Sequence, residues 1–178
     1  MSAFSAAPRA SEPRSQIVVG ISDGKVSVDG TPLVTYALGS CVAVCAFNAA
    51  SKVAGLLHIM LPDSSLDLRK AADNPCMFAD TGVAYLLAEL SRRGSPPKGL
   101  SIRLAGGAQV MNDAGLFSIG KRNYTAVRKS LWKAGLMVDG EAVGGEVSRT
   151  VRLDPSSGRV VVREGGGREF EIPLKRKL

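Results

Sequence analysis

Residues 42–61 read VAVCAFNAASKVAGLLHIML, and much of the architecture can be argued from this stretch. Two apolar runs, Val42 to Phe47 and Val53 to Leu61, flank the polar connection Asn48-Ala49-Ala50-Ser51-Lys52. Short β-prone runs around such a connection predict an antiparallel hairpin. If the loop is Asn48 to Ser51 and Phe47 lies opposite Lys52, Cys41 lies directly opposite His58 on the same face, with Cβ atoms about 4.5–5.5 Å apart.

Upstream of the hairpin, short apolar runs alternate with turn signals. We expect strands over Ile17 to Ile21, Val26 to Val28 and Leu33 to Leu38, the first two closed by the pairs Asp23-Gly24 and Asp29-Gly30. Glycine adopts positive φ at no steric cost, so Asp-Gly pairs favour tight turns.

Downstream of the hairpin, helices and strands are both expected. Apolar residues recur at helical spacing in Phe78 to Arg93 and again in Arg122 to Ala134, which predicts two helices. Strands are expected at Leu100 to Ala105 and Phe170 to Leu174, and as a second hairpin in which Val147 to Leu153 and Arg159 to Arg163 flank Asp154 to Gly158. The fold class is therefore α+β, with helices over the outer faces of mixed, hairpin-rich sheets.

Length and composition indicate one domain. The chain has 178 residues, of which 45% are hydrophobic. We divide it into a disordered N-terminal arm (1–15), one domain (16–174) and a basic tail (175–178). No apolar run reaches the roughly 18 residues of a membrane span, and the N-terminus lacks the apolar segment of a secretory signal. We expect a cytoplasmic protein that does not insert into membranes.

Cysteine, histidine and charge content narrow the function further. The three cysteines are Cys41, Cys45 and Cys76, and His58 is the one histidine. An odd cysteine number without an export signal does not predict a disulfide framework, and a closed zinc site needs four good ligands. We expect no metal. The net charge of +7 indicates an acidic partner, and 5% aromatic residues argue against a stacking platform for single-stranded nucleic acid.

Cys41 and His58 are the candidate chemical pair. A neighbouring imidazolium can lower the pKa of a thiol, and the thiolate can then attack a carbonyl while the histidine protonates the leaving group. Gly39 permits a sharp turn, so the Ser40 and Cys41 N–H groups could bind a developing oxyanion. The alternative is structural, because cysteine is often buried filler, as Cys45 on the same face illustrates.

These residues belong to a longer pattern. The run Thr35-Tyr36-Ala37-Leu38-Gly39-Ser40-Cys41-Val42-Ala43-Val44, followed by His58-Ile59-Met60-Leu61-Pro62, resembles the CheD family of chemoreceptor glutamine deamidases. The resemblance covers about residues 17–163 and departs at Ser148, where many members have glycine. It continues through Asp80-Thr81, Gly106-Gly107-Ala108, Met111, Ile119-Gly120, Arg122-Asn123, Gly144-Gly145, Ser148-Arg149-Thr150 and Gly158-Arg159-Val160.

The resemblance implies an activity and a site. It implies a layered α/β/β/α sandwich like that of Cys/His toxin-type deamidases. It makes Cys41 the nucleophile, His58 the general base and acid, and Thr35 the residue that orients the histidine. Ser40 and Gly39 are the candidate substrate-binding residues because of the oxyanion site expected above. The reaction would hydrolyse a glutamine amide of methyl-accepting chemotaxis receptors to glutamate and ammonia, through a thioester and without a cofactor. A CheC-type phosphatase is a further expected partner, nucleic acid is not, and we expect a monomer.

Other features leave alternatives open. The basic stretch Lys121 to Lys133 is either a solvated helix face or a docking surface for an acidic receptor bundle. We expect Gly106-Gly107 to be a tight strand exit, and Trp132 and Phe117 to be core residues; an exposed one would become a candidate phosphatase contact. Rival functions are a non-catalytic basic binding module for a signalling protein or RNA, and a receptor-sequestering protein with weak activity.

Overall fold

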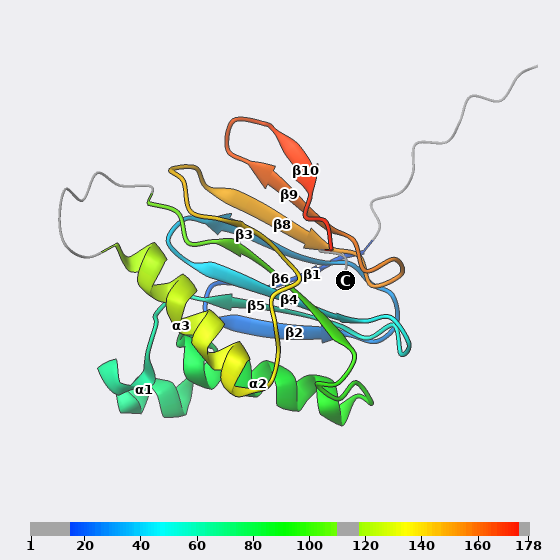
Figure 1. Ribbon diagram of the computed structural model, residues 1–178, viewed down its shortest axis with the longest axis horizontal. Coiled ribbons are helices and arrows are strands. Elements are labelled where there is room, and N and C mark those ends of the chain that lie inside the picture. The colour runs from blue at the N-terminus through cyan, green and yellow to red at the C-terminus, as the bar shows by residue number, and fades with distance from the viewer. Residues whose placement is uncertain (1–14, 110–117, 175–178) are drawn as a thin grey trace, which may run out of the picture.

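Two five-stranded sheets pack face to face, and helices cover one of them (Figure 1). The computed structural model describes residues 15–109 and 118–174, so the predicted basic tail and Phe117 lie outside the described residues, as does nearly all of the predicted arm. The central sheet has the order β2-β5-β4-β6-β7 and the outer sheet the order β1-β3-β8-β9-β10. Both are mixed, because β6 and β7 pair in parallel, as do β1 and β3. The predicted α+β class with mixed sheets is confirmed.

The central sheet is buried on both faces. It consists of β2 (Asp23–Ser27), β5 (Ala54–Ile59), β4 (Val42–Asn48), β6 (Leu100–Gly106) and β7 (Gly140–Val143). Every residue of β4 and β5 is buried. Side chains alternate along a strand, so Val42 and Val44 join the core under the helices, while Ala43 and Cys45 join the core between the sheets.

The two predicted helices are present and cover the central sheet. α2 (Ala79–Arg92) contacts β2 and β5, and α3 (Ile119–Lys133) contacts β4 and α2. α3 begins three residues before the predicted Arg122 because the Ser118 side chain caps it at the Lys121 N–H. Three short elements were not predicted: the 3-10 helices η1 (Ser64–Leu66) and η2 (Pro75–Met77), and α1 (Leu68–Asp73).

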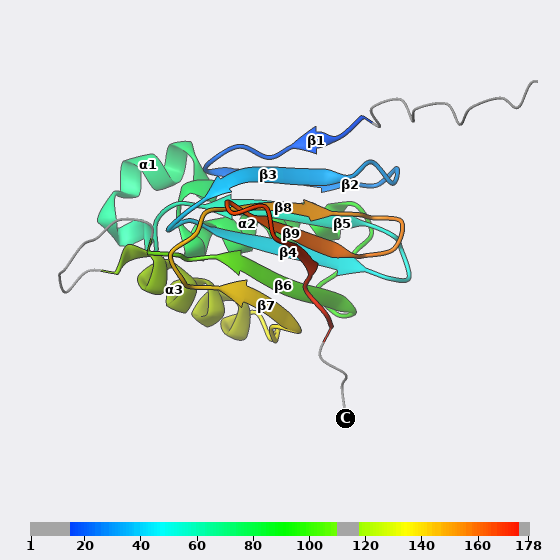
Figure 2. The same cartoon turned by 90° about the horizontal axis from the view of Figure 1, so that it is seen from above.

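The outer sheet lacks the second helical layer that we expected. It contains β1 (Ile17–Val18), β3 (Leu33–Leu38), the predicted hairpin β8 (Arg149–Leu153) and β9 (Val160–Glu164), and the edge strand β10 (Glu169–Glu171). In the described part of the chain no helix lies over its outer face (Figures 1 and 2). The layers are α/β/β, because that face carries side chains such as Arg152 and Arg163, which remain in water.

One local prediction near the N-terminal strands was wrong, and one strand, β7, was not predicted. Asp23-Gly24 does not close a strand but starts β2, and the turn precedes it, with Ser22 at φ 56°. β7 was not predicted, because its four residues carry no alternating pattern; it is placed by parallel pairing with β6.

The β4–β5 hairpin forms with a register different from the predicted one. Asn48 N–H donates to Val53 O at 3.0 Å, and Phe47 lies opposite Ala54 rather than Lys52. The loop is Ala49 to Lys52 because the Asn48 side chain accepts from Ala50 N at 2.9 Å and Ser51 N at 3.2 Å, which holds the turn one residue later. Lys52 closes it with φ 58°.

Candidate active site

The candidate site lies where the chain passes from the outer sheet to the central sheet. β3 ends at Leu38, and Gly39 to Cys41 lead into β4. A β-bulge precedes this crossing, because Thr35 pairs with Val151 but Leu38 pairs with Arg149, and Ala37 adopts φ 56°. Because of the extra residue, Thr35 and Leu38 are both fully buried although they are three positions apart, and the chain leaves the sheet after Leu38.

Thr35 and His58 meet across the two sheets, as the resemblance implied. Thr35 Oγ1 lies 2.7 Å from His58 Nδ1 and also donates to Val19 O at 2.7 Å. A hydroxyl has a single hydrogen. Since that hydrogen is given to Val19, Thr35 must accept from His58, so Nδ1 carries the imidazole proton and Nε2 presents its lone pair.

His58 is held neutral by its surroundings. The residue is fully buried, and Nε2 has no hydrogen-bond partner among the described residues. Burial lowers the pKa of His58 to about 4, although the Asp23 carboxylate, opposite His58 on β2, acts in the other direction. At neutral pH the side chain is therefore an uncharged base.

Cys41 is close to His58 in register but not directly opposite it. Because Val42 pairs with Ile59 and Ala43 with His58, Cys41 falls two residues from the direct partner of His58, a diagonal separation of about 7–8 Å between strands. The predicted direct pairing is therefore wrong, although the predicted shared face is correct. Two residues are one full period of a strand, which preserves the face.

The protonation state of Cys41 also differs from the expected ion pair. Cys41 is partly exposed. Burial raises the pKa of its thiol, and its own backbone N–H only partly offsets this. A neutral His58 provides no positive charge to stabilise a thiolate. At neutral pH the site therefore holds a thiol and an uncharged imidazole rather than an ion pair.

The backbone of the predicted substrate-binding residues is fixed by three donors. Ala108 N donates to Gly39 O at 2.8 Å, Asn123 Nδ2 to Ser40 O at 3.0 Å, and Gly107 N to Cys41 O at 2.7 Å. Gly106 permits this approach: its φ is 100°, and a Cβ there would lie 2.2 Å from Cys41 O. The predicted tight exit at Gly106-Gly107 is confirmed, and it supports the nucleophile segment.

Asn123 reaches the site from α3, and only the family pattern had pointed to it. It is fully buried, and its Nδ2 also donates to Met60 O at 2.9 Å. Gly120, one turn earlier, lets α3 approach, because a Cβ there would lie 2.6 Å from Gly107 O. In the sequence, the signal that could have indicated this contact was the pair Gly120 and Asn123, three residues apart on an otherwise basic helix.

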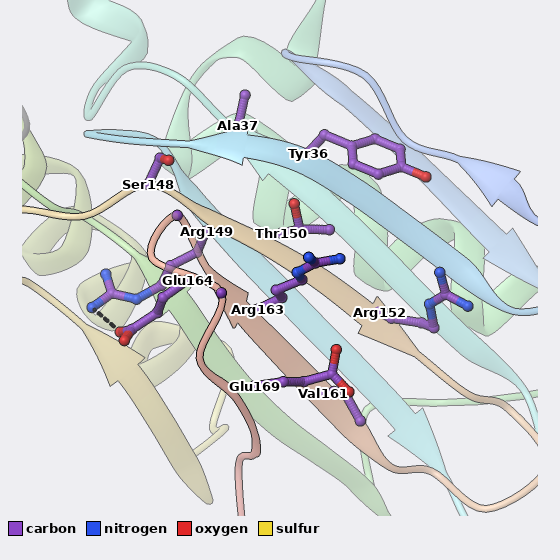
Figure 3. Close-up of a pocket in the computed structure, with 12 residues that line it drawn as sticks. Tyr36, Ala37, Ser148, Arg149, Thr150, Arg152, Val161, Arg163, Glu164 and Glu169 are labelled. Carbon is purple, nitrogen blue, oxygen red and sulfur yellow. Dashed lines mark hydrogen bonds and ion pairs between the residues drawn. The ribbon is translucent and has the colours of Figure 1, made fainter.

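A separate hollow of about 600 Å³ lies on the outer face of the outer sheet. Its lining includes Tyr36, Arg152 and Arg163, which project from that face, and an ion pair between Arg149 and Glu164 at 3.3 Å (Figure 3). Thr35 points the other way, into the space between the sheets. The hollow is therefore not the Cys41 site.

α3 carries the basic stretch, and Trp132 is not a core residue. The Trp132 side chain is 70% exposed, so the predicted core position is wrong. Arg128 is engaged, because its guanidinium lies 2.7 Å from Tyr124 Oη and 3.7 Å from Glu141. Lys129 and Lys133 are exposed on the same helix.

Neither a metal-binding cluster nor a membrane-spanning helix is present in residues 15–109 and 118–174. No group of three or more His, Cys, Asp or Glu side chains is placed to hold a metal ion within these ranges. No helix in the same ranges combines the length and apolar character required to cross a membrane.

Comparison with known proteins agrees with the earlier resemblance. A family model described as "CheD chemotactic sensory transduction" matches residues 60–164, which begin just after His58. "Probable chemoreceptor glutamine deamidase CheD" of Solibacter usitatus is 46% identical over 159 residues, covering 89% of this chain and 94% of the relative. "Chemoreceptor glutamine deamidase CheD" of Thermotoga maritima is 38% identical over 156 residues, covering 87% and 96%.

Proposed function

The chain belongs to the CheD family, and we propose that it hydrolyses glutamine side-chain amides of chemoreceptors, converting glutamine to glutamate and releasing ammonia. It is a protein-glutamine deamidase that acts in chemotaxis. The observation that best supports a catalytic role of the predicted residues is the His58 tautomer. Thr35 accepts the Nδ1 hydrogen, so the bare Nε2 is the nitrogen left for a thiol proton.

In the first half-reaction His58 activates Cys41. Nε2 takes the thiol proton as Sγ forms a bond to the amide carbon, and the carbonyl electron pair moves to oxygen. The imidazolium then donates that proton to the nitrogen, the C–N bond breaks, and ammonia leaves a thioester on Cys41. Cys41 and His58 are placed diagonally on the same face, and the amide group would bind between the sulfur and Nε2.

The second half-reaction reverses the proton path. His58 Nε2 takes a proton from water as the water oxygen attacks the thioester carbon. The C–S bond then breaks, glutamate leaves, and the proton returns to the Cys41 sulfur. Thr35 keeps Nδ1 as the proton-bearing nitrogen through both halves, since its own hydrogen is committed to Val19 O. No cofactor takes part in these steps.

The finer features of the function rest on chemistry and resemblance. The substrate is the helical cytoplasmic part of the receptor, and the reaction takes place in the cytoplasm, consistent with three free cysteines. The protein acts as a monomer, and a CheC-type phosphatase is its second partner. The exposed Trp132 is the candidate contact for that phosphatase.

Mass spectrometry of a receptor cytoplasmic fragment tests the function. The wild type should convert encoded glutamines to glutamate, whereas Cys41→Ala and His58→Ala should not. Cys45→Ala is the matched control, because Cys45 is a thiol on the same strand face but fully within the core. Binding without conversion would favour the sequestering function, and equal conversion by Cys41→Ala would contradict the cysteine mechanism.

A further inference from the structure

We propose that Asn123 is a positioning residue that fixes the Ser40–Cys41 peptide, so that the Cys41 N–H is presented to the oxyanion formed during deamidation. This inference rests on the proposed function and adds a residue that neither the register of the hairpin nor the Cys/His pair identifies. It starts from one side-chain amide that bonds both the segment before β4 and the residue after β5.

Asn123 joins the segment that carries the nucleophile to the segment that follows the base. Its Nδ2 group has two hydrogens, and it has two acceptors: Ser40 O at 3.0 Å and Met60 O at 2.9 Å. Both acceptors are carbonyl oxygens, so the amide cannot be flipped without facing oxygen with oxygen. The side chain is fully buried, and Oδ1 has no partner among the described residues.

The consequence for Cys41 follows from peptide geometry. The described chain contains no cis peptide bond, so the Ser40 carbonyl and the Cys41 N–H point in opposite directions. Because Asn123 holds the carbonyl on one side, it holds the N–H on the other. That N–H belongs to the same residue as the nucleophilic sulfur. The donor therefore lies beside the sulfur, where an oxyanion develops after attack.

The neighbouring contacts explain why a side chain is needed at this point. Ala108 N and Gly107 N hold the Gly39 and Cys41 carbonyls by backbone pairing. The Ser40 carbonyl lies beyond the end of the β4–β5 ladder, whose last pair is Val42 with Ile59. At that end Met60 N and Leu61 N both donate to Met77 O, so the Ser40 carbonyl depends on Asn123.

The test separates an oxyanion role from a structural one. Asn123→Ala and Asn123→Asp are compared with the wild type for kcat and KM on the receptor fragment, and for the rate of Cys41 alkylation by iodoacetamide. Alkylation displaces iodide at a saturated carbon and forms no oxyanion, but it needs an accessible, correctly activated thiol. Tyr124→Phe is the matched control. Tyr124 is the next residue of α3, and the substitution removes a hydroxyl that bonds Glu141 and Arg128 but neither Ser40 nor Met60.

We expect kcat to fall about 100-fold in both Asn123 variants, the loss typical for one oxyanion donor. KM and the pH profile of alkylation should stay as in the wild type, and Tyr124→Phe should retain its kcat. If Asn123→Ala does not fold, Asn123→Ser is measured in the same way, because serine is too short to reach both carbonyls.

Three results would overturn the proposal in distinguishable ways. Equal kcat in wild type and Asn123→Ala refutes the role of Asn123 alone. A parallel loss of alkylation and kcat shows that Asn123 supports the thiol or the fold rather than the oxyanion. No deamidation by the wild type refutes the proposed function, and this inference with it.

Discussion

The Thr35 hydroxyl lies 2.7 Å from His58 Nδ1 and gives its own hydrogen to Val19 O, so the hydrogen bond between Thr35 and His58 can run in one direction only. Thr35 belongs to the outer sheet and His58 to the central sheet. The protonation of the imidazole is therefore set by the packing of two layers. It does not require the carboxylate that orients histidine in many hydrolases.

Thr35→Val should lower kcat about 100-fold, within the range that a positioned base contributes. Valine keeps the shape but accepts no hydrogen bond, so His58 is no longer held with its proton on Nδ1. Thr35→Ser, which retains the hydroxyl, should keep most of the wild-type kcat. Because His58 is the one histidine in the sequence, nitrogen-15 NMR of labelled protein reads its tautomer directly. An Nε2–H tautomer in the wild type would contradict the mechanism.

His58 should make the protein sensitive to acid. Folding lowers its pKa from 6.5 to about 4. Between these two pH values the unfolded chain binds a proton on His58 that the folded chain does not bind. The free energy of unfolding is therefore highest above pH 6.5 and decreases as the pH falls toward 4. The free energy of unfolding should decrease by about 3 kcal/mol over this range.

Urea unfolding of the wild type and His58→Gln at a series of pH values measures this effect. Acidic groups also titrate as the pH is lowered; for example, hydrogen bonds with Ser65 lower the pKa of Asp63. Because these groups are present in both proteins, their contributions cancel when the two free energies of unfolding are subtracted. The free energy of unfolding of the wild type should fall relative to the variant as the pH is lowered from 6.5. A constant difference over that range would show that His58 is already protonated in the fold, or is solvated.

Cys41 should react as a thiol rather than as part of an ion pair. Because burial raises its pKa and His58 is neutral, its alkylation rate should keep rising from pH 7 to about 9, around the ordinary thiol pKa. Iodoacetamide labelling followed by mass spectrometry measures the rate, with Cys41→Ala as the blank for Cys45 and Cys76. A rate that is already constant below pH 7 would instead indicate a thiolate–imidazolium pair.

The hairpin shows both how far the sequence argument reaches and where it ends. Periodicity located both strands, and parity placed Cys41 and His58 on one face. The register itself depends on the Asn48 side chain, which accepts from Ala50 N and Ser51 N and displaces the loop by one residue on each strand. The shift moves the residue opposite His58 by two positions, from Cys41 to Ala43. The alternation of side chains along a strand has a period of two, so it identifies the face on which Cys41 lies but not the residue opposite it.

Contacts between segments that are far apart in the sequence were harder to predict than the helices and strands themselves. The link from Asn123 to Ser40 spans 83 residues and depends on the close approach of Gly120 to Gly107. Neither leaves a periodic signal in the sequence. Trp132, in contrast, could have been placed: it follows the buried Leu131 by one residue, about 100° around the helix, and is 70% exposed.

Gly106→Ala should damage both stability and catalysis. A Cβ at this position would lie 2.2 Å from Cys41 O, so the nucleophile segment must move. We expect a loss of about 3 kcal/mol or more in the free energy of unfolding, and a lower kcat in the fraction that folds. Gly94→Ala is the matched control. It also has positive φ, at 78°, but no atom lies within 4 Å, so only the backbone cost of about 1–2 kcal/mol should appear.

The exposed end of α3 should guide a large acidic substrate to the site. Lys129, Trp132 and Lys133 are exposed there, while Arg128 already pairs with Glu141. Charge reversal at Lys129 and Lys133 should slow deamidation of the receptor fragment at low salt, because surface charges act mainly on the encounter rate and are screened by salt. The rate on a small amide substrate should not change.

Arg163→Glu provides the matched charge change for each single lysine reversal, since Arg163 lies on the outer face of the outer sheet, away from α3. Trp132→Ala should weaken binding of the proposed phosphatase partner rather than of the receptor, with little effect on stability, because its side chain is mostly in water. If the lysine variants slow the small amide and the receptor fragment equally, the effect is on the active site. Equal slowing by Arg163→Glu would show a response to net charge, and the basic face of α3 would then be only a solvated surface.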